Sequence, residues 1–413
     1  MEYGLIGGAL GHSFSPFIHA RFARYNYTLC ELPPEDLAAF LSAGQFSGLN
    51  VTMPYKEAVI PHLDWLDDSA AAIGAVNTVV RRGGRLLGYN TDFGGMLSML
   101  SRAEIDLRGK KVLILGTGGA AKTAQAVARH CGAAEILPVS RTNKPCAVTY
   151  DAALRDHADA RILINATPVG MYPNLDEMPI DPAAFPLLEG VADLIYNPLH
   201  TRLCLEAARR GVRTCNGLFM LVRQAALACA LFTGQPVPAP QTEEIYRSLL
   251  TAQENLVLIG MPGSGKTTVG RLLAQKLGRV FIDTDEEISK TTGTPVQTLL
   301  AACGEPHFRS LEAELVRALA DRQGCVIATG GGTVLAPENE RRLRQNGRLV
   351  FLDRPLEQLT ATDRHPLSDT PEKLRRLYEA RHGLYLAAAD DAVRLAAAAD
   401  PADYAAAILK NFS

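Results

Sequence analysis

Short apolar runs alternate with longer segments of helical periodicity along almost the whole chain. One such helical segment is predicted at 19–25. The apolar runs with the length and composition of buried strands lie at 3–7, 48–52, 111–115, 136–139, 161–165, 191–196, 256–259 and 280–282. Strands that alternate with helices are typical of parallel sheets whose faces are covered by helices. The pattern therefore predicts the α/β fold class throughout.

The order of these segments indicates successive α/β regions. Residues 1–105 carry strand and helix patterns of their own, and a new strand begins at Lys110. A Pro-rich turn at 233–240 ends the second pattern, a short polar helix follows, and the next strand begins at about Asn255 after a linker of a few residues. The predicted domains are 1–105 together with helices at about 216–250, then 106–215, and then 254–413.

Composition and charge indicate which classes of binding partner the protein can have. The 413 residues favour roughly two to three domains, and 47% hydrophobic with 21% charged residues is typical of a soluble globular protein. A net charge of −2 without long runs of like charge gives no footprint for nucleic acid or an anionic membrane. The 8 cysteines are scattered without metal-ligand spacing. We expect small-molecule partners, no nucleic-acid or membrane partner, no signal peptide, and a cytoplasmic location; the oligomeric state stays open.

A glycine-rich loop directly follows the strand at 111–115. It is Gly116-Thr117-Gly118-Gly119-Ala120. Glycines in this pattern allow a tight turn and bring a pyrophosphate close to the start of the next helix, predicted at 121–130. After the second strand an NAD site would place an acidic residue, but this chain has Ser140-Arg141-Thr142-Asn143-Lys144. Because Arg141 and Lys144 suit a 2′-phosphate, the sequence favours NADP(H) over NAD.

A second glycine-rich loop, of a different kind, follows the strand at 256–259. It is Gly260-Met261-Pro262-Gly263-Ser264-Gly265-Lys266-Thr267, a P-loop pattern whose backbone N–H groups cradle phosphates. Lys266 and Thr267 then serve the phosphates and Mg²⁺. Asp283 and Asp285 leave the next strand on one face, so one can hold Mg²⁺ through water while the other meets a substrate hydroxyl. We predict ATP and Mg²⁺ as ligands, with Thr267 and Asp283 at the metal.

The segment 254–413 resembles shikimate kinase across its length. The resemblance rests on the P-loop followed in order by Asp283-Thr284-Asp285, Gly304-Glu305-Pro306-His307-Phe308-Arg309, Gly330-Gly331-Gly332-Thr333, Asp363-Arg364-His365-Pro366-Leu367 and Arg381-His382-Gly383-Leu384-Tyr385. It implies that Arg309 and Arg381 grip the substrate carboxylate, that Asp285 binds ring hydroxyls, and that Gly331 lies beneath the substrate. The implied ATP-binding residues are Gly263, Ser264, Gly265, Lys266, Thr267, Thr268 and Arg364, and the implied catalytic residues are Lys266, Asp285 and Arg364.

Two further points concern this segment. Taken alone, Arg309 and Glu312, one helical turn apart, would be a plain surface ion pair, but the surrounding motif at 304–309 and the glycine cluster at 330–333 argue against that interpretation. The resemblance also implies that Arg364, in the lid, closes over the phosphates and stabilises the transferred charge. The stretch at 359–362 lacks the additional arginine often found upstream of that lid.

Residues 1–250 resemble shikimate dehydrogenase over their whole length. The motifs are Ser13-Phe14-Ser15-Pro16, Asn50-Val51-Thr52-Met53-Pro54-Tyr55-Lys56, Gly74-Ala75-Val76-Asn77-Thr78, Tyr89-Asn90-Thr91-Asp92, Asn165-Ala166-Thr167-Pro168-Val169-Gly170-Met171 and Gly217-Leu218-Phe219-Met220. The resemblance implies an α/β substrate domain followed by a Rossmann-like NADP domain, ahead of the P-loop kinase α/β domain with its parallel sheet. The implied substrate contacts are Ser13, Ser15, Thr52, Lys56, Asn77, Asp92, Tyr196 and Gln224. The implied cofactor contacts are Gly116, Thr117, Gly118, Gly119, Ala120, Ser140, Arg141, Thr142, Lys144, Asn165, Leu194, Gly217 and Met220.

The chemistry implied for this first part suits Lys56 and Asp92. When a hydride passes from NADPH to a ring ketone, the developing alkoxide needs a proton donor held close by. The resemblance implies that Lys56 gives this proton and that Asp92 orients the ammonium and the reacting hydroxyl. Taken singly, Lys56 would be a solvated surface lysine and Asp92 a helix N-cap.

Together the two resemblances imply consecutive reactions: reduction of 3-dehydroshikimate to shikimate with NADPH, then phosphorylation of the shikimate 3-hydroxyl with ATP. One alternative is an NAD-linked quinate/shikimate oxidoreductase fused to a small-molecule kinase, which the basic residues after 136–139 and the paired serines disfavour. Another is a ligand-sensing module with degenerate catalysis, which would show missing catalytic residues or an added helix-turn-helix. Neither feature is seen in the sequence.

Overall fold

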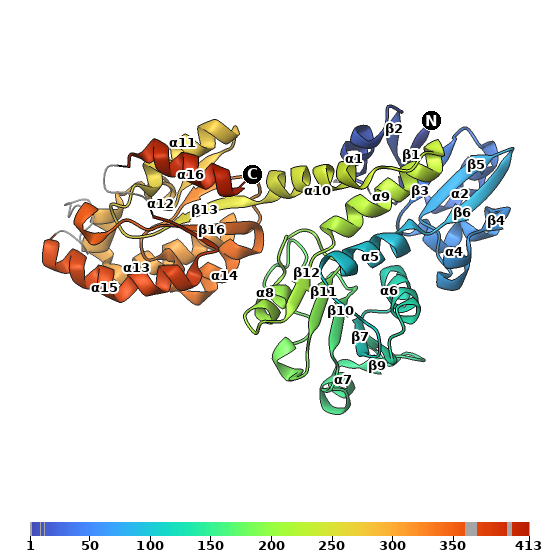
Figure 1. Ribbon diagram of the computed structural model, residues 1–413, viewed down its shortest axis with the longest axis horizontal. Helices are drawn as coiled ribbons and strands as arrows, with labels where there is room; N and C mark the ends of the chain where they lie inside the picture. The colour runs from blue at the N-terminus through green and yellow to red at the C-terminus, as the bar shows by residue number, and fades with distance from the viewer. Residues whose placement is uncertain (1, 9, 12, 360–369, 395–398, 413) are drawn as a thin grey trace. The chain divides into compact units, whose positions relative to one another are not determined.

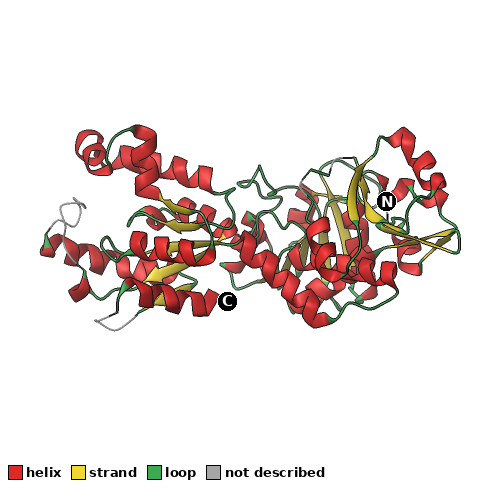
Figure 2. Ribbon diagram, turned by 90° about the horizontal axis from the view of Figure 1, so that it is seen from above, coloured by secondary structure: helices red, strands yellow, loops and turns green. Residues whose placement is uncertain are grey.

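The computed structural model describes residues 2–8, 10–11, 13–359, 370–394 and 399–412 (Figure 1). By its internal contacts the chain separates into two compact units, which are treated one at a time below. The first unit comprises Met1–Tyr196 and Thr201–Leu250, and the second comprises Asn197–His200 and Thr251–Ser413. Within each unit, strands are sandwiched between helices (Figure 2), which confirms the predicted α/β class. Short 3-10 turns are η1 (Pro34–Asp36), η2 (Ile60–His62), η3 (Pro182–Ala184), η4 (Thr333–Leu335) and η5 (Leu356–Gln358).

The first sheet of the first unit has the strand order β2-β1-β3-β5-β6-β4. Strands β1 to β3 pair in parallel, whereas β5 pairs antiparallel with both β3 and β6. Its strands are β1 (Tyr3–Gly7), β2 (Tyr27–Glu31), β3 (Gly48–Val51), β4 (Trp65–Leu66), β5 (Thr78–Arg82) and β6 (Arg85–Tyr89). The helices that accompany it are α1 (Ser15–Phe22), α2 (Leu37–Ala43), α3 (Tyr55–Ala58) and α4 (Asp68–Ile73).

The helix predicted at 19–25 begins and ends earlier than expected. Helix α1 starts at Ser15 because Pro16 lies in its first turn, where a missing N–H costs no hydrogen bond. It ends at Phe22, since Ala23 is extended and the chain then enters β2.

The second sheet of the first unit is parallel throughout, with the order β12-β11-β10-β7-β8-β9. Counted from its own first strand, this is the doubly wound order that binds dinucleotides where the strand order reverses, here between β7 and β10. Its strands are β7 (Lys111–Leu115), β8 (Glu135–Ser140), β9 (Val148–Thr149), β10 (Ile162–Asn165), β11 (Gly190–Asp193) and β12 (Arg213–Cys215). The helices are α5 (Thr91–Arg102), α6 (Gly119–His130), α7 (Tyr150–Asp156), α8 (Arg202–Ala208), α9 (Leu218–Thr233) and α10 (Ala239–Gln253).

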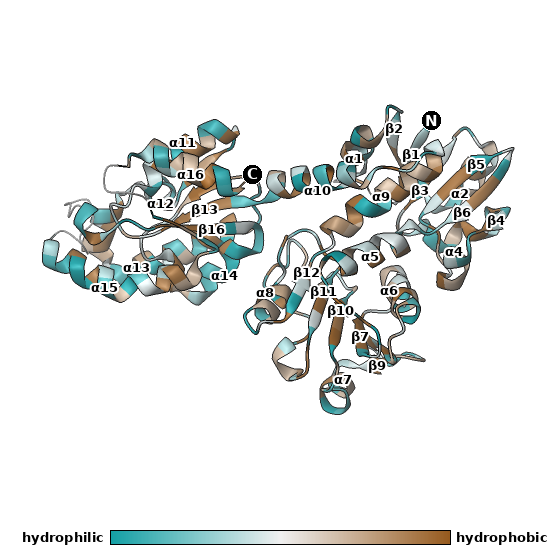
Figure 3. Cartoon of the chain, viewed as in Figure 1, coloured by the Kyte–Doolittle hydropathy of each residue, from teal (hydrophilic) through white to brown (hydrophobic). Residues whose placement is uncertain are grey.

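Burial on both faces explains the continuous apolar runs of this sheet. Along β7, Val112 and Ile114 enter one hydrophobic cluster while Leu113 and Leu115 enter the other, as the alternation of side chains along a strand requires. The hydropathy colouring shows β7 and β10 as largely hydrophobic (Figure 3). Strand β11 ends at Asp193, three residues before the predicted end of the run at 191–196.

The sheet of the second unit is also parallel, with the order β14-β15-β13-β16-β17. Strand β13 lies between β15 and β16, so the P-loop that follows it opens at a point where the strand order reverses. The strands are β13 (Asn255–Ile259), β14 (Phe281–Asp283), β15 (Val326–Ala328), β16 (Gly347–Leu352) and β17 (Asp391–Val393). The helices are α11 (Lys266–Leu277), α12 (Thr284–Thr292), α13 (Val296–Leu319), α14 (Pro337–Asn346), α15 (Pro371–Ala388) and α16 (Pro401–Phe412).

No helix within the part of the chain that the structure describes has the length and apolar character needed to cross a membrane.

Two candidate active sites

The first site centres on an ion pair between Lys56 and Asp92. Lys56 lies in α3 and Asp92 in the first turn of α5, and the Lys56 Nζ to Asp92 Oδ2 distance is 2.7 Å. The two side chains keep 26% and 15% of their exposure, so the pair is partly desolvated yet open to a ligand. Asp92 is not the N-cap of α5, because Asn90 holds that position and accepts from the N–H of Phe93. Lys56 is therefore not a solvated surface lysine, and Asp92 is not a helix N-cap, as each residue taken singly would suggest.

A buried amide network stands beside this pair. The Asn77 Oδ1 accepts from the Thr91 N–H at 2.7 Å, and the Asn77 Nδ2 donates to the Thr91 Oγ1 at 3.0 Å. The Thr91 hydroxyl in turn lies 3.5 Å from the Gln224 Oε1 on α9. Because Thr91 precedes Asp92, these contacts bring two predicted substrate amides next to the ion pair.

The two serines predicted to bind a carboxylate share one turn. The Ser15 N–H donates to the Ser13 Oγ at 3.2 Å. Phe14, between them, packs edge-on against Tyr196, with ring centroids 6.1 Å apart, so the turn faces the chain just after β11. Burial raises the pKa of Tyr196, which keeps its hydroxyl protonated as a donor. Thr52 lies directly after β3, and its N–H donates to the Ile6 carbonyl at 2.9 Å.

The first glycine loop has the geometry of a dinucleotide-binding turn. Gly116 has a φ of +112°, and a Cβ there would lie 3.0 Å from the Ala166 carbonyl oxygen, so the position requires glycine. A Cβ at Gly118 or Gly119 would meet nothing within 4 Å. Helix α6 begins at Gly119 with no side-chain cap. The first backbone N–H groups of α6 therefore have no side-chain acceptor from a cap. Together with the open side of the glycine loop, they fit a pyrophosphate.

The residues after β8 fit the phosphorylated form of the dinucleotide. The Lys144 Nζ donates to the Thr117 Oγ1 at 2.9 Å. The side chain predicted to bind the 2′-phosphate therefore contacts the glycine loop. The Ser140 Oγ accepts from the Thr142 N–H at 3.3 Å. Arg141 is exposed at the same strand end. Cationic side chains and hydroxyls, with no carboxylate among 140–144, are a donor set suited to a phosphate.

Asp193 organises the cofactor side of this site and was missed by the sequence prediction. Its carboxylate is fully buried and accepts from the Asn165 Nδ2 at 3.0 Å, the Ile195 N–H at 3.0 Å and the Thr201 Oγ1 at 2.6 Å. Burial raises its pKa to about 6. The Ile195 contact also explains why β11 ends at Asp193, because the side chain captures the N–H of a following residue. A lone acidic residue inside an apolar run was the available signal.

Close backbone packing completes the cofactor side. Gly217 donates its N–H to the Ile195 carbonyl at 2.9 Å, and a Cβ at Gly217 would lie 2.2 Å from the Leu194 carbonyl oxygen. A Cβ at Gly95 would lie 2.9 Å from the Met220 carbonyl oxygen. The predicted contacts Leu194, Gly217 and Met220 therefore sit at points where two main chains nearly touch.

The second site begins with the P-loop. Gly260, Gly263 and Gly265 all have positive φ, which turns the loop around the start of α11. The Lys266 Nζ donates to the carbonyls of Gly260 and Met261 at 2.9 Å and 2.8 Å. Burial lowers its pKa to about 8. Thr268 lines the same cavity, and Ser264 is buried in the loop.

Thr267 and Asp283 form a pair of hard oxygen donors. The Thr267 hydroxyl donates to the Asp283 Oδ2 at 2.7 Å. Asp283 also caps α12, because its Oδ1 accepts from the N–H groups of Asp285 and Glu286 at 3.0 Å and 3.3 Å. A hydroxyl and a carboxylate are ligands that Mg²⁺ prefers, and Mg²⁺ at nucleotides is held by few protein ligands plus phosphates and water. Accordingly, the described residues contain no cluster of three or more His, Cys, Asp or Glu placed to hold a metal.

A cavity of about 790 Å³ opens beside the P-loop, and Asp285 faces it. Among the described residues, the Asp285 Oδ1 is buried without a hydrogen-bond partner. Its pKa is raised to about 6, mainly by burial and further by the charges of Asp283 and Glu312, against the opposing Lys266 and Arg309. A buried carboxylate with a free oxygen can accept a proton from a bound hydroxyl.

Arg309 projects into this cavity from α13 and is held from behind. Its Nη1 donates to the Glu312 Oε2 at 2.9 Å, and its Nη2 donates to the Glu305 Oε1 at 2.9 Å. Glu312 has no exposure, and it accepts from the Thr333 hydroxyl at 2.6 Å. Arg309 and Glu312 therefore form an ion pair, but not the plain surface pair that the two residues alone would suggest and that the surrounding motifs argue against.

The third glycine cluster lines the same cavity and begins beside Asp285, because a Cβ at Gly330 would lie 2.9 Å from the Asp285 Oδ1. The Gly331 carbonyl accepts from the Arg381 Nη1 at 3.1 Å and from the Tyr385 hydroxyl. A Cβ at Gly332 would lie 2.2 Å from the Arg309 Nη2. The cavity thus brings together Lys266, Thr267, Asp283, Asp285, Arg309, Gly331 and Arg381. The predicted lid with Arg364 lies outside the described residues.

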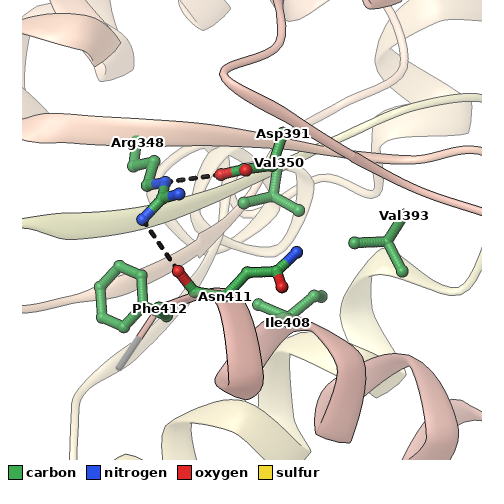
Figure 4. Close-up of a pocket in the computed structure, with 7 residues that line it drawn as sticks. All are labelled: Arg348, Val350, Asp391, Val393, Ile408, Asn411 and Phe412. Atoms are coloured by element: carbon green, nitrogen blue, oxygen red, sulfur yellow. Dashed lines mark hydrogen bonds and ion pairs between the residues drawn. The ribbon is translucent and has the colours of Figure 1, made fainter.

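A smaller hollow lies at the edge of the same sheet (Figure 4). It is lined by Arg348, Val350, Asp391, Val393, Ile408, Asn411 and Phe412. Arg348 donates from its Nε to the Asp391 Oδ2 at 2.5 Å and from its Nη1 to the Asn411 carbonyl at 3.3 Å. The hollow has essentially no free volume, so these contacts anchor α16 to β16 and β17.

Fold and geometry define a chain that joins a dinucleotide-binding unit of the dehydrogenase type to a P-loop unit of the small-molecule kinase type. Family models match both: the shikimate dehydrogenase substrate-binding domain at residues 5–79 and shikimate kinase at residues 262–412.

Individual relatives agree with the match to shikimate dehydrogenase. The NADP(+) shikimate dehydrogenase of Moorella thermoacetica is 38% identical over 288 residues, which cover 63% of this chain and 96% of that protein. The crystal structure of a chorismate mutase/shikimate 5-dehydrogenase fusion protein from Clostridium acetobutylicum has a TM-score of 0.57 at 33% identity, and covers 60% of this chain and 96% of that one. Shikimate 5-dehydrogenase from Thermus thermophilus, solved with NADP(H) and shikimate, has a TM-score of 0.55 at 35% identity over 60% of this chain and 99% of that one. The chain belongs to the shikimate dehydrogenase family and carries a shikimate kinase domain after it.

Proposed function

We propose that this chain is a bifunctional enzyme that reduces 3-dehydroshikimate to shikimate with NADPH and then phosphorylates shikimate to shikimate 3-phosphate with ATP. The observations that carry the proposal are the Lys56–Asp92 ion pair in one unit and the cavity that Asp285, Arg309 and Arg381 line together in the other. The product of the first reaction is the substrate of the second.

In the reductase, Lys56 delivers the proton. Ser13 and Ser15 bind the substrate carboxylate, while Asn77 and Gln224 bind ring hydroxyls beside Thr91. When bound, NADPH supplies the hydride that reduces the ketone. Asp92 holds the Lys56 ammonium at 2.7 Å, so that the proton donor points at the oxygen on which negative charge develops.

In the kinase, Asp285 accepts the proton of the attacking hydroxyl. Arg309 and Arg381 hold the carboxylate of shikimate, and this fixes the ring so that one hydroxyl reaches Asp285. Lys266 leaves the loop carbonyls to meet the phosphates, where its positive charge offsets the charge of the transferred group. Thr267 and Asp283 would hold Mg²⁺, which neutralises phosphate charge when bound.

The direct test measures both activities on the purified chain. NADPH oxidation with 3-dehydroshikimate and ATP-dependent phosphorylation of added shikimate should each proceed. A chain that bound the ligands but turned over neither would revive the interpretation as a ligand-sensing module.

The NAD-linked quinate/shikimate oxidoreductase is the alternative within enzymes. The contact of Lys144 with Thr117 and the exposed Arg141 support NADPH instead. Rates with NADPH and NADH on shikimate and quinate separate the two. Arg141→Ser should weaken NADPH binding and leave NADH binding nearly unchanged; equal effects on both would favour the alternative.

Three further predictions from the sequence are kept as proposals. The domain boundaries are 1–105 with about 216–250, then 106–215, and 254–413. The compartment is the cytoplasm. Arg364 closes over the phosphates as part of a lid.

A further inference from the structure

Two buried threonine hydroxyls bracket Gly330 in the second unit. The Gly330 N–H donates to the Thr284 Oγ1 at 2.8 Å, and the Thr333 hydroxyl donates to the Gly330 carbonyl at 3.1 Å. Both threonines have no exposure. Because Gly330 is buried too, its N–H depends on the Thr284 hydroxyl rather than on water, while its carbonyl also accepts from the Thr333 N–H at 3.2 Å.

Each threonine connects Gly330 to a different part of the site. Thr284 stands between Asp283 and Asp285 at the start of α12. The one proton of the Thr333 hydroxyl is shared between the Gly330 carbonyl and the nearer Glu312 Oε1, which lies at 2.6 Å, and Glu312 in turn accepts from Arg309 at 2.9 Å. The glycine loop is therefore tied both to the proton acceptor and to a carboxylate-binding arginine.

The loop fits its neighbours with little room to move. A Cβ at Gly330 would lie 2.9 Å from both the Asp285 Oδ1 and the Glu312 Oε1. The next residue, Gly331, presents its carbonyl to the Arg381 Nη1 at 3.1 Å. A shift of Gly330 would thus change its distances to Asp285 and, through Gly331, to Arg381.

We propose that Thr284 and Thr333 form a polar clamp that positions the loop Gly330–Gly332 for the acceptor substrate of the kinase. They are positioning residues, since they act through Gly330 and not on the substrate itself. The proposal rests on the kinase function proposed above. It predicts that loss of the clamp impairs acceptor binding more than ATP binding, because within the described part of the chain the side chains of Lys266 and Thr267 bond to the P-loop carbonyls and to Asp283 rather than to either threonine.

The test replaces Thr284 in the full chain. Thr284→Val keeps the shape but leaves the buried Gly330 N–H without an acceptor, which should raise the KM for shikimate by about tenfold and leave the KM for ATP within about twofold. Thr284→Ser restores the hydroxyl and should restore the KM. Thr292→Val is the matched control: it removes a hydroxyl of the same helix that donates to the Ile288 carbonyl at 2.8 Å, and kinase kinetics should stay as in the wild type.

Hydrogen exchange gives a readout that is independent of turnover. The amides of 330–332 should exchange faster in Thr284→Val than in the wild type, and again slowly in Thr284→Ser. Thr333→Val should show the same selective rise in the shikimate KM. The clamp would be refuted by an unchanged shikimate KM with unchanged exchange, or by equal losses for shikimate and ATP that Ser does not rescue. A wild-type chain without kinase turnover would instead refute the proposed function. The exchange rates of the 330–332 amides would then still test whether the Thr284 hydroxyl holds the Gly330 N–H.

Discussion

At the scale of single residues, the two sites prepare their proton-transferring groups in different ways. Lys56 and Asp92 neutralise each other at 2.7 Å with part of each side chain exposed. Among the described residues Asp285 forms no ion pair: it is buried close to Asp283 and Glu312, and its pKa is raised to about 6. The first arrangement holds the proton donor in place, and the second presents a carboxylate that can accept a proton.

Replacing Lys56 should separate the two activities. Lys56→Ala removes the proton donor, so the rate of 3-dehydroshikimate reduction should fall by about 10²- to 10⁴-fold. Phosphorylation of added shikimate should be unchanged. The matched control is Lys111→Ala, which removes a lysine paired with Glu135 and Asp159 at 2.9 Å on the same unit and should retain reduction. Comparable losses from both substitutions, or retained reduction in Lys56→Ala, would contradict the assignment.

Asp285 should govern the pH dependence of the kinase. If it accepts the proton, kcat/KM for shikimate should rise as the pH increases through about 6, because only the carboxylate form works. Asp285→Asn should abolish the kinase and leave the reductase intact. A profile that is flat between pH 5 and pH 7 would contradict this role.

The same residue should lower stability at neutral pH. Its pKa is raised above the ordinary 3.8 to about 6, so the folded state binds the proton more tightly than the unfolded state. That stabilising contribution is present below about pH 4 and is lost as the pH rises through about 6. Asp285→Asn should therefore raise the free energy of unfolding of the kinase unit at pH 8 by about 3 kcal/mol. Scanning calorimetry can check this on the transition that shifts when ATP is added; no gain at pH 8 would contradict it.

Residue types and motif order indicated most of these side chains from the sequence, but burial did not follow from them. The spacing of Arg309 and Glu312 predicts a surface pair, yet Glu312 is fully buried because Thr333 and Gly330 pack over it from another part of the chain. Asp193 was missed for the same reason: its partners Asn165 and Thr201 become neighbours only after folding.

At the scale of secondary structure elements, both sites form where loops follow parallel strands. The strand predicted at 3–7 is observed as β1 with the same bounds, and the strand expected to begin at about Asn255 is observed as β13, which begins there. Ends set by side chains were harder to predict. Asp193 ends β11 by binding the Ile195 N–H, and Pro16 allows α1 to begin at Ser15.

Two glycines of the cofactor site should respond differently to the same substitution. A Cβ at Gly217 would lie 2.2 Å from the Leu194 carbonyl oxygen, whereas a Cβ at Gly118 would meet nothing within 4 Å. Gly217→Ala should therefore destabilise the first unit by about 1–3 kcal/mol. Gly118→Ala should fold normally but raise the KM for NADPH, since the methyl group would stand where the pyrophosphate approaches. Thermal unfolding and NADPH titration measure both effects; the reverse assignment of stability and binding losses would contradict the account.

At the scale of the whole molecule, the first unit has two sheets and the second has one, and each unit has its own hydrophobic core and its own site. Two variants with complementary defects should therefore restore the sequence of reactions when mixed. Lys56→Ala and Lys266→Ala should each fail alone to convert 3-dehydroshikimate into shikimate 3-phosphate, and succeed together with free shikimate as the intermediate. A mixture that stays inactive, although each variant keeps its other reaction, would show that the two sites do not work independently.

The most direct test of the central claim is a coupled assay on the wild-type chain. The chain is incubated with 3-dehydroshikimate, NADPH, ATP and Mg²⁺, and the products are followed by mass spectrometry. The account predicts NADPH oxidation followed by accumulation of shikimate 3-phosphate. NADPH oxidation that stops at shikimate, or no consumption of 3-dehydroshikimate at all, would contradict it.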